Sequence, residues 1–321
     1  MKAALKVLGV LVLLVLVSGG GFFLWASSSS AKTLARTIET HRAEFPIPFP
    51  LDSAAAAGLT PDSAAAVALA QAQERGEHLV ESRYACLECH GENLGGGVMI
   101  DAPAIGRLLG PNITTGAGSK TLTYTAVDWD RIVRHGVLPD GRPAAMPSMD
   151  FVSMSDQELS DVIVYVRSLA PVDNTVPGPT LGPIGKILMA TGKLLVSADQ
   201  IDAHDAAHLT IPPVAAPTIE FGKHMAAPCT GCHAENLAGG PIVGGDPAWP
   251  PAGNLTPHAT GIAGWTLEQF TVALREARRP DGTALLPPMN GMIEFAANKT
   301  DVEIEALYLY LQSLPPTPKP G

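Results

Sequence analysis

Apolar and polar residues divide the chain into one long uncharged run and a series of shorter mixed segments. The run from Val7 to Ala26 has no charged residue and follows Lys2 and Lys6. About 20 apolar residues suffice for a helix to span a membrane, and flanking lysines favour the cytoplasmic side. A cleaved signal peptide would have a shorter apolar core of roughly 7–15 residues, with Ala26 or Ala31 at its cleavage site. We predict an uncleaved anchor and an exported body.

The apolar positions of several later segments repeat with helical spacing. An alanine-rich helix is predicted from Pro61 towards Glu81, with Thr60 as its cap. Two further helices are predicted in MSDQELSDVIVYVRSL and KTDVEIEALYLYLQSL, which begin with the N-cap signals SD and TD. The first places Leu159 and Ile163 on one face. The pattern therefore predicts a largely helical protein.

Proline-rich stretches mark the boundaries between the helical regions. They are FPIPFP, APVDNTVPGPTLGP and IPPVAAP. Between the last two lies IGKILMATGKLLVSADQ, which predicts an amphipathic helix. We expect this helix to pack between two domains, with contact to the membrane surface as the alternative.

The two halves of the chain repeat one another. Matched positions are Gly76 with Gly222, His90 with His233, Asn112 with Asn254, and LPDGR at 138–142 with RPDGT at 279–283. The offset stays between 141 and 146 residues, which indicates a tandem duplication with small insertions. A chain of 321 residues has room for two domains of ordinary size.

Composition narrows the classes of partner. A formal net charge of −10 argues against nucleic acid, because such a partner requires a basic surface. The acidic charge would steer basic partners, or it serves only solubility. Aromatic residues make up 5 %, which leaves few large rings to fill two cores.

All four cysteines belong to two copies of the sequence C-x-x-C-H. The copies are Cys86, Cys89 and His90 in the first half, and Cys229, Cys232 and His233 in the second. Export to an oxidising compartment would favour disulfides, but closing so short a loop removes little chain entropy and leaves the histidines without a role. C-x-x-C-H is the attachment signature of c-type haem. We predict that the cysteines bind two covalent haem c groups and that His90 and His233 ligate the irons.

A structural zinc site is the competing interpretation of two C-x-x-C pairs. It would have to join the two halves at one metal ion, and it does not explain the histidines. We therefore prefer the haem interpretation.

Methionine is a frequent sixth ligand of haem iron. Met146 and Met289 each lie 56 residues after the histidine of their own half, and we predict that they are the axial ligands. Met149 and Met292 form an equally matched pair, each 59 residues after its histidine. Any of the four could instead fill a gap in a core.

Each half resembles a class I cytochrome c domain. The shared features are a first helix with a glycine, C-x-x-C-H, an NLT-like turn, a methionine beside proline and a closing helix with an aromatic residue. RHGVLPDGRPAAMPSMDF and LREARRPDGTALLPPMNGM resemble the methionine segments of membrane-anchored bacterial dihaem cytochromes c. The resemblance covers roughly residues 70–315. One departure is that Met289 follows two prolines and precedes Asn290.

The resemblance implies an all-α fold of two tandem class I cytochrome c domains after an N-terminal transmembrane helix. It also implies that Gly76 and Gly222 let the first helix of each domain approach the last, near Tyr165 and Tyr310. The expected segments are an anchor at 1–30, a linker at 31–60, domain 1 at 61–172, an interdomain linker with a helix at 173–216, domain 2 at 217–316 and a tail at 317–321. The other histidines are expected at the surface or in hydrogen bonds, among them His78, His135, His204, His224 and His258.

The expected function is electron transfer between a redox protein donor and an acceptor in the periplasm or membrane. The haem domains would lie in the periplasm, held at the inner membrane by a single span, with no nucleic-acid partner and no substrate site of the chain's own. A dihaem peroxidase-like oxidoreductase with one open iron is the enzymatic alternative. A third hypothesis is the cytochrome subunit of a respiratory dehydrogenase complex.

Overall fold

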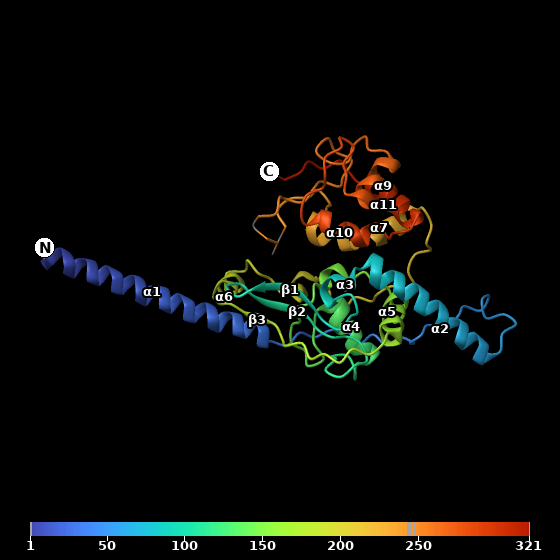
Figure 1. Cartoon of the computed structure of the whole chain (residues 1–321), viewed down its shortest axis with the longest axis horizontal. Coiled ribbons are helices and arrows are strands. Elements are labelled where there is room, and N and C mark those ends of the chain that lie inside the picture. Colours follow the sequence, from blue (N-terminus) through green and yellow to red (C-terminus); the bar gives the residue numbers. More distant parts are fainter. Residues whose placement is uncertain (1, 243–244, 247, 321) are drawn as a thin grey trace.

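The structure is a computed structural model that describes residues 2–242, 245–246 and 248–320. Figure 1 shows a long N-terminal helix that projects away from two compact bodies. The helices are α1 Lys2–Ala35, α2 Pro61–His78, α3 Cys86–His90, α4 Ala126–His135, α5 Asp156–Ser168, α6 Pro183–Ala190, α7 Ile219–Ala226, α8 Thr230–His233, α9 Leu267–Glu276, α10 Met289–Ala296 and α11 Asp301–Ser313. The strands are β1 Gly97–Ala102, β2 Gly106–Gly110 and β3 Thr180–Leu181.

Helix α1 contains the predicted apolar run and continues beyond it. Its 34 residues include a window of mean hydropathy 2.6, none of which is buried against the rest of the chain. Among the described residues, it is the one helix long and apolar enough to cross a membrane. Ala26 and Ser30, towards its C-terminal end, are buried.

Helix α6 packs against α1 rather than between the two domains (Figure 1). The expected interdomain position is therefore wrong. Gly185 lies so close to the Ile105 carbonyl oxygen that a β-carbon would collide with it. This close approach lets α6 pack beside β2 and β3. Lys186 also lies over the Phe23 ring of α1, with its Nζ 5.9 Å from the centroid.

The first and last helices of each domain cross at a glycine. A β-carbon at Gly76 would collide with the Asp161 carbonyl oxygen and would lie 2.7 Å from Tyr165 Cβ. Gly222 packs in the same way against α11, where a β-carbon would lie 2.7 Å from Tyr310 Cβ. The predicted close approach of these helices is confirmed in both halves.

Each closing helix begins with a capping box. In α5, Ser155 Oγ accepts a hydrogen bond from the Glu158 backbone and the Glu158 carboxylate accepts one from the Ser155 backbone. Thr300 and Glu303 make the same pair of hydrogen bonds in α11. The apolar face of α5 lies in the core of domain 1, where the fully buried side chains include Leu159, Ile163 and Val166.

A small antiparallel sheet in domain 1 departs from the expected all-helical architecture. Its order is β1-β2-β3, with Gly97 opposite Gly110 and Gly106 opposite Leu181. Strand β3 belongs to the linker between domains, so its pairing depends on residues distant in the sequence. The chain is otherwise mostly helical, as predicted.

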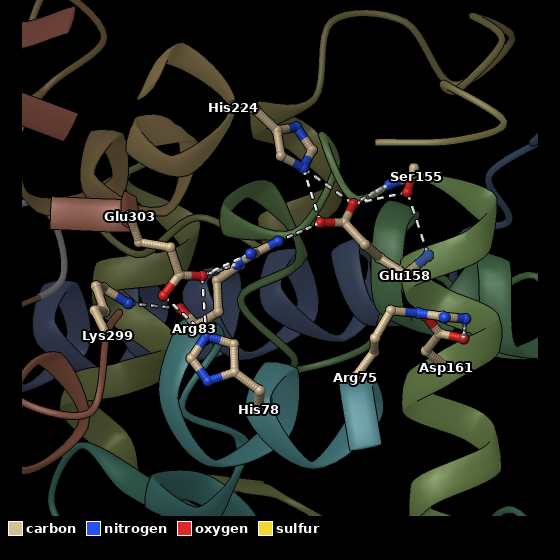
Figure 2. Close-up of polar contacts among 9 residues, drawn as sticks. All are labelled: Arg75, His78, Arg83, Ser155, Glu158, Asp161, His224, Lys299 and Glu303. Carbon is tan, nitrogen blue, oxygen red and sulfur yellow. Dashed lines mark hydrogen bonds and ion pairs between the residues drawn. The ribbon is translucent and has the colours of Figure 1, made fainter. Parts of the chain in front are cut away.

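Two histidine–glutamate pairs connect the domains reciprocally (Figure 2). His78 of domain 1 lies 2.8 Å from Glu303 of α11, and His224 of domain 2 lies 2.9 Å from Glu158 of α5. Arg83 donates hydrogen bonds to both glutamates, at 2.7 Å to Glu158 and 2.6 Å to Glu303. The recurrence of these histidines at matched positions is thus explained by the domain interface.

The interface stabilises the charged form of both glutamates. Burial by itself raises the pKa of Glu303, but its hydrogen bond with His78 and the nearby Arg83 charge lower that pKa to about 2. Burial opposes ionisation of Glu158 as well, yet His224 and Arg83 together lower its pKa. The same two carboxylates also cap the N-termini of α5 and α11. Glu158 and Glu303 therefore stabilise both the starts of these helices and the contact between the domains.

Candidate haem centres

Each C-x-x-C-H sequence forms about one turn of helix. Cys86 to His90 form α3, which follows Ala85 in the left-handed conformation at φ 49°. In the second domain Cys229 ends a 3-10 turn and the motif continues into α8. All four thiols are free. This brings the two thiols of each pair to one side of a single turn, as attachment to one haem edge requires.

The motif histidines are held in one orientation by backbone carbonyl groups. His90 Nδ1 lies 2.8 Å from the Pro111 oxygen, and His233 Nδ1 lies 2.7 Å from the Gly253 oxygen. A carbonyl can only accept, so each Nδ1 donates and each Nε2 keeps a free lone pair. Burial lowers the pKa of both rings. A neutral imidazole fixed by a second hydrogen bond is the form that ligates iron, so these residues fit haem.

Buried asparagines hold the loops that supply those carbonyls. Asn112 directly follows Pro111, and its side chain donates to the Val172 oxygen at 2.6 Å. Asn254 directly follows Gly253 and donates to the Thr317 oxygen at 2.7 Å. Each asparagine thus ties the acceptor loop to the segment after its domain's closing helix. Asn112 and Asn254 occupy matched positions of the sequence repeat. Nothing in the sequence indicated that the carbonyl before each asparagine would bind the motif histidine.

The second attachment motif lies at the domain interface, where Asp150 of domain 1 lies against Gly231. A β-carbon at Gly231 would collide with the Asp150 carboxylate. Burial raises the pKa of both Cys89 and Cys232, and the Asp150 charge raises each further. Burial also raises the pKa of Asp150 itself to about 7. One carboxyl group therefore acts on both motifs.

The predicted axial methionines lie in different local structures. Met146 is partly buried against the core of domain 1, just before the 3-10 turn Ser148–Asp150 that contains Met149. Met289 is the first residue of α10, and Met292 lies in the same helix. Met289 therefore differs from Met146 in local structure as well as in its neighbouring residues, since it follows two prolines and precedes Asn290. Met146 and Met289 remain predictions as ligands.

Residues 71–166 match the family described as cytochrome c oxidase, cbb3-type, subunit III. Residues 220–315 match the family described as cytochrome c. The fold and both motif sites therefore define the chain as a protein with two cytochrome c domains, as the sequence predicted.

The chain is homologous to the cytochrome c subunits of dehydrogenases. It is 27 % identical over 260 residues to the cytochrome c subunit of alcohol dehydrogenase (quinone) from Gluconacetobacter polyoxogenes, covering 73 % of this chain and 54 % of the relative. The gluconate 2-dehydrogenase cytochrome c subunit of Pantoea cypripedii is 26 % identical over 276 residues, with 75 % and 59 % covered. The fructose dehydrogenase cytochrome subunit of Gluconobacter japonicus is 36 % identical over 105 residues, with 30 % and 21 % covered. The chain thus spans little more than half the length of the first two relatives.

Proposed function

We propose that the chain is a dihaem c-type cytochrome that transfers electrons. The observation that carries this proposal is the duplicated motif in which His90 and His233 each donate from Nδ1 to a fixed carbonyl. In this function Cys86 and Cys89 hold one haem covalently, and Cys229 and Cys232 hold the other. Bound haem supplies one-electron redox chemistry at its iron.

The protein's own contribution is to fix the two sites and keep them adjacent. The carbonyls of Pro111 and Gly253 orient the ligating rings, and burial keeps those rings neutral. Asp150 of domain 1 lies against Gly231 of the second attachment motif, and its charge also raises the pKa of Cys89 in the first. Two sites in domains that contact one another suit the passage of electrons from one domain to the other.

The proposed setting is a dehydrogenase complex at the inner membrane. The dehydrogenase cytochrome subunits that it resembles support this setting, and α1 provides a membrane-spanning segment. The haem domains would lie in the periplasm, accept electrons from a redox partner protein and pass them to an acceptor in the periplasm or membrane.

Covalent haem is tested by mass and by haem staining after denaturation. The purified full chain should carry two haems, and replacing Cys86 and Cys89 with alanine should leave one. Replacing Cys229 and Cys232 should remove the other. A wild-type chain that loses all haem on acid extraction would contradict covalent attachment.

The complex is tested separately, by mild detergent extraction of membranes from the native host. The chain should co-purify with a larger dehydrogenase subunit when α1 is intact. If a fully haem-loaded chain always isolates alone, it is a free-standing carrier and the subunit proposal fails while the haem proposal stands.

A peroxidase-like enzyme with one open iron is the second candidate function. It is favoured by one observation, the helical setting of Met289 and Met292, which differs from that of Met146. Binding of carbon monoxide or cyanide to one of the two irons would support it.

A further inference from the structure

Three histidines and one aspartate meet in domain 1, away from both haem motifs. His41 lies in the segment after α1, Asp130 and His135 lie in α4, and His208 lies in the linker before domain 2. Their ligand atoms all lie within 4.8 Å of one another. Asp130 and His135 are fully buried. The four side chains therefore come from three segments that are far apart in the sequence.

The nitrogen atoms that meet in this cluster carry free lone pairs. His204 Nε2 donates to the Ala198 oxygen at 3.0 Å, so in the neutral ring its Nδ1 accepts. That nitrogen lies 3.1 Å from His135 Nδ1, which therefore donates and leaves His135 Nε2 bare. His41 Nδ1 donates to the His204 carbonyl at 3.0 Å, which leaves His41 Nε2 bare as well.

Asp130 supplies the oxygen of the cluster. Its Oδ1 accepts a hydrogen bond from Arg134 at 2.7 Å, whereas its Oδ2 is buried and has no hydrogen-bond partner. Nε2 of His41 and of His135 each lie 3.7 Å from this Oδ2. That distance is too long for a hydrogen bond, and a buried unpaired carboxylate oxygen is costly.

The third nitrogen comes from His208. Its Nε2 lies 3.2 Å from His135 Nε2 and 3.7 Å from Asp130 Oδ1. Burial, together with nearby positive charge, lowers the pKa of both His135 and His208 to about 3. For His135 the charges after burial are those of His208, His41, His204 and Arg134, and for His208 they are those of Arg134 and His41. A neutral imidazole is the form that binds metal.

We infer that His41, Asp130, His135 and His208 bind a divalent transition-metal ion, in the first place zinc. Four ligands at about 2.0–2.1 Å from a tetrahedral zinc would be about 3.3–3.4 Å apart. Nε2 of His208 lies 3.2 Å from Nε2 of His135, each histidine Nε2 lies 3.7 Å from an Asp130 carboxylate oxygen, and all four ligand atoms lie within 4.8 Å of one another, so the side chains must draw together to reach this geometry. Imidazole nitrogen with one carboxylate oxygen suits zinc in particular. A hydrogen-bonded histidine cluster alone would leave Asp130 Oδ2 unpaired.

Such a site would join the anchor segment, domain 1 and the interdomain linker. His41 is six positions beyond Ala35, the last residue of α1, so the ion would fix where the anchor meets the first haem domain. Four protein ligands leave no open position, which is typical of a structural site. His204 is a positioning residue, since its ring and its carbonyl orient His135 and His41.

The first experiment measures metal in the full haem-loaded chain, purified in detergent with a histidine-free affinity tag. Elemental analysis should give about one zinc per chain beside two haem irons. After dialysis against chelator, calorimetry with zinc chloride should show one tight site. X-ray absorption at the zinc edge should show nitrogen and oxygen ligands at about 2.0–2.1 Å with imidazole scattering. Failure of the stripped chain to bind added zinc would overturn the inference.

The second experiment uses variants. His135→Gln with His208→Gln should abolish zinc binding, and His204→Ala should weaken it by about 10–100-fold. His258→Gln, which changes a histidine outside the cluster, is the matched control and should bind zinc normally. Iron content reports folding in each case. Zinc bound equally by the double variant and the wild type would place the ion elsewhere and refute this site.

Discussion

At the scale of single residues, the same polar device appears in both domains. A carbonyl orients each motif histidine, and a buried asparagine anchors the loop that carries the carbonyl. Glycine has an equally specific role where helices cross, because the backbone of the partner helix occupies the space of a β-carbon. The histidine depends on a carbonyl oxygen that accepts its hydrogen bond, and the helix crossing depends on the absence of a β-carbon.

The sixth ligands are predicted to be Met146 and Met289. Met146→Ala should remove one methionine–iron charge-transfer band and lower one of the two potentials, because the thioether favours ferrous iron. Met289→Ala should do the same at the other haem. The measurement is a spectroscopic redox titration of chains with full haem content.

Met149→Ala and Met292→Ala are the matched controls, each three positions along the chain. Both variants should keep the two methionine–iron charge-transfer bands and leave the two haem reduction potentials unchanged. If they alone cause the losses, the register of the ligands is wrong by three residues. If neither methionine of domain 2 matters, the peroxidase-like function gains support.

Gly222→Ala tests the helix crossing. The added methyl group would meet the backbone of α11, and overpacking of this kind costs about 1–3 kcal/mol. Chemical denaturation of the haem-loaded chain measures this loss. Gly178→Ala is the control, since a β-carbon there meets nothing within 4 Å and should change stability by less than about 0.5 kcal/mol. Equal stabilities of the two variants would argue against close packing at Gly222.

At the scale of elements, the first turn of each closing helix has two tasks. Glu158 and Glu303 complete the capping boxes of α5 and α11, and each also pairs with a histidine of the opposite domain. Arg83 of domain 1 contacts both carboxylates. The start of each helix is therefore stabilised by the other domain. This arrangement makes the interface sensitive to the ionisation of two carboxyl groups.

Acid should weaken the domain interface through Glu303. Its pKa falls from an ordinary value of 4.5 to about 2, so its ionisation stabilises the folded chain fully above pH 4.5. This contribution is lost as the pH falls from 4.5 towards 2. Glu303→Gln should flatten the pH dependence of unfolding in that range and cost roughly 3 kcal/mol at neutral pH, because the largely buried Arg83 loses one of its two charge partners.

Denaturant unfolding between pH 2 and pH 6 measures this effect. The control is Glu268→Gln, which changes an exposed glutamate in the first turn of α9. It should keep the wild-type slope against pH. A Glu303→Gln variant with an unchanged slope would show that this carboxylate does not link pH to stability.

At the scale of the whole molecule, α1 is separated in composition from the rest but packs against it at one end. Ala26 and Ser30 are buried in α1, and α6 packs against that helix. No residue of the apolar window is buried against the rest of the chain. The helix therefore combines an apolar stretch long enough to cross a membrane with a C-terminal end that supports α6.

Removal of residues 1–26 should separate these two roles. With a cleavable export signal in their place, the chain should become soluble and keep both haems, since the cores of the domains do not include the removed run. Fractionation and haem staining test this. The anchor prediction fails if the native chain is already soluble in the periplasm and cut near Ala26 or Ala31.

The sequence by itself determined the features that depend on local spacing. The two C-x-x-C-H motifs, the apolar run, the capped closing helices and the glycines at matched positions all follow from residues near one another or from the repeat. These signals are strong because haem attachment, membrane insertion and helix capping each require particular residue types at short, fixed separations.

Only the tertiary structure decided which distant residues meet. His78 and His224 repeat in the sequence, but nothing local shows that each reaches a glutamate of the opposite domain. The position of α6 and the pairing of β3 were likewise invisible, because both depend on linker residues folding back. His41 and His208 lie 167 positions apart, and only the folded chain brings them to the same buried carboxylate. Long-range contacts follow from the packing of whole domains, which periodicity and spacing do not encode.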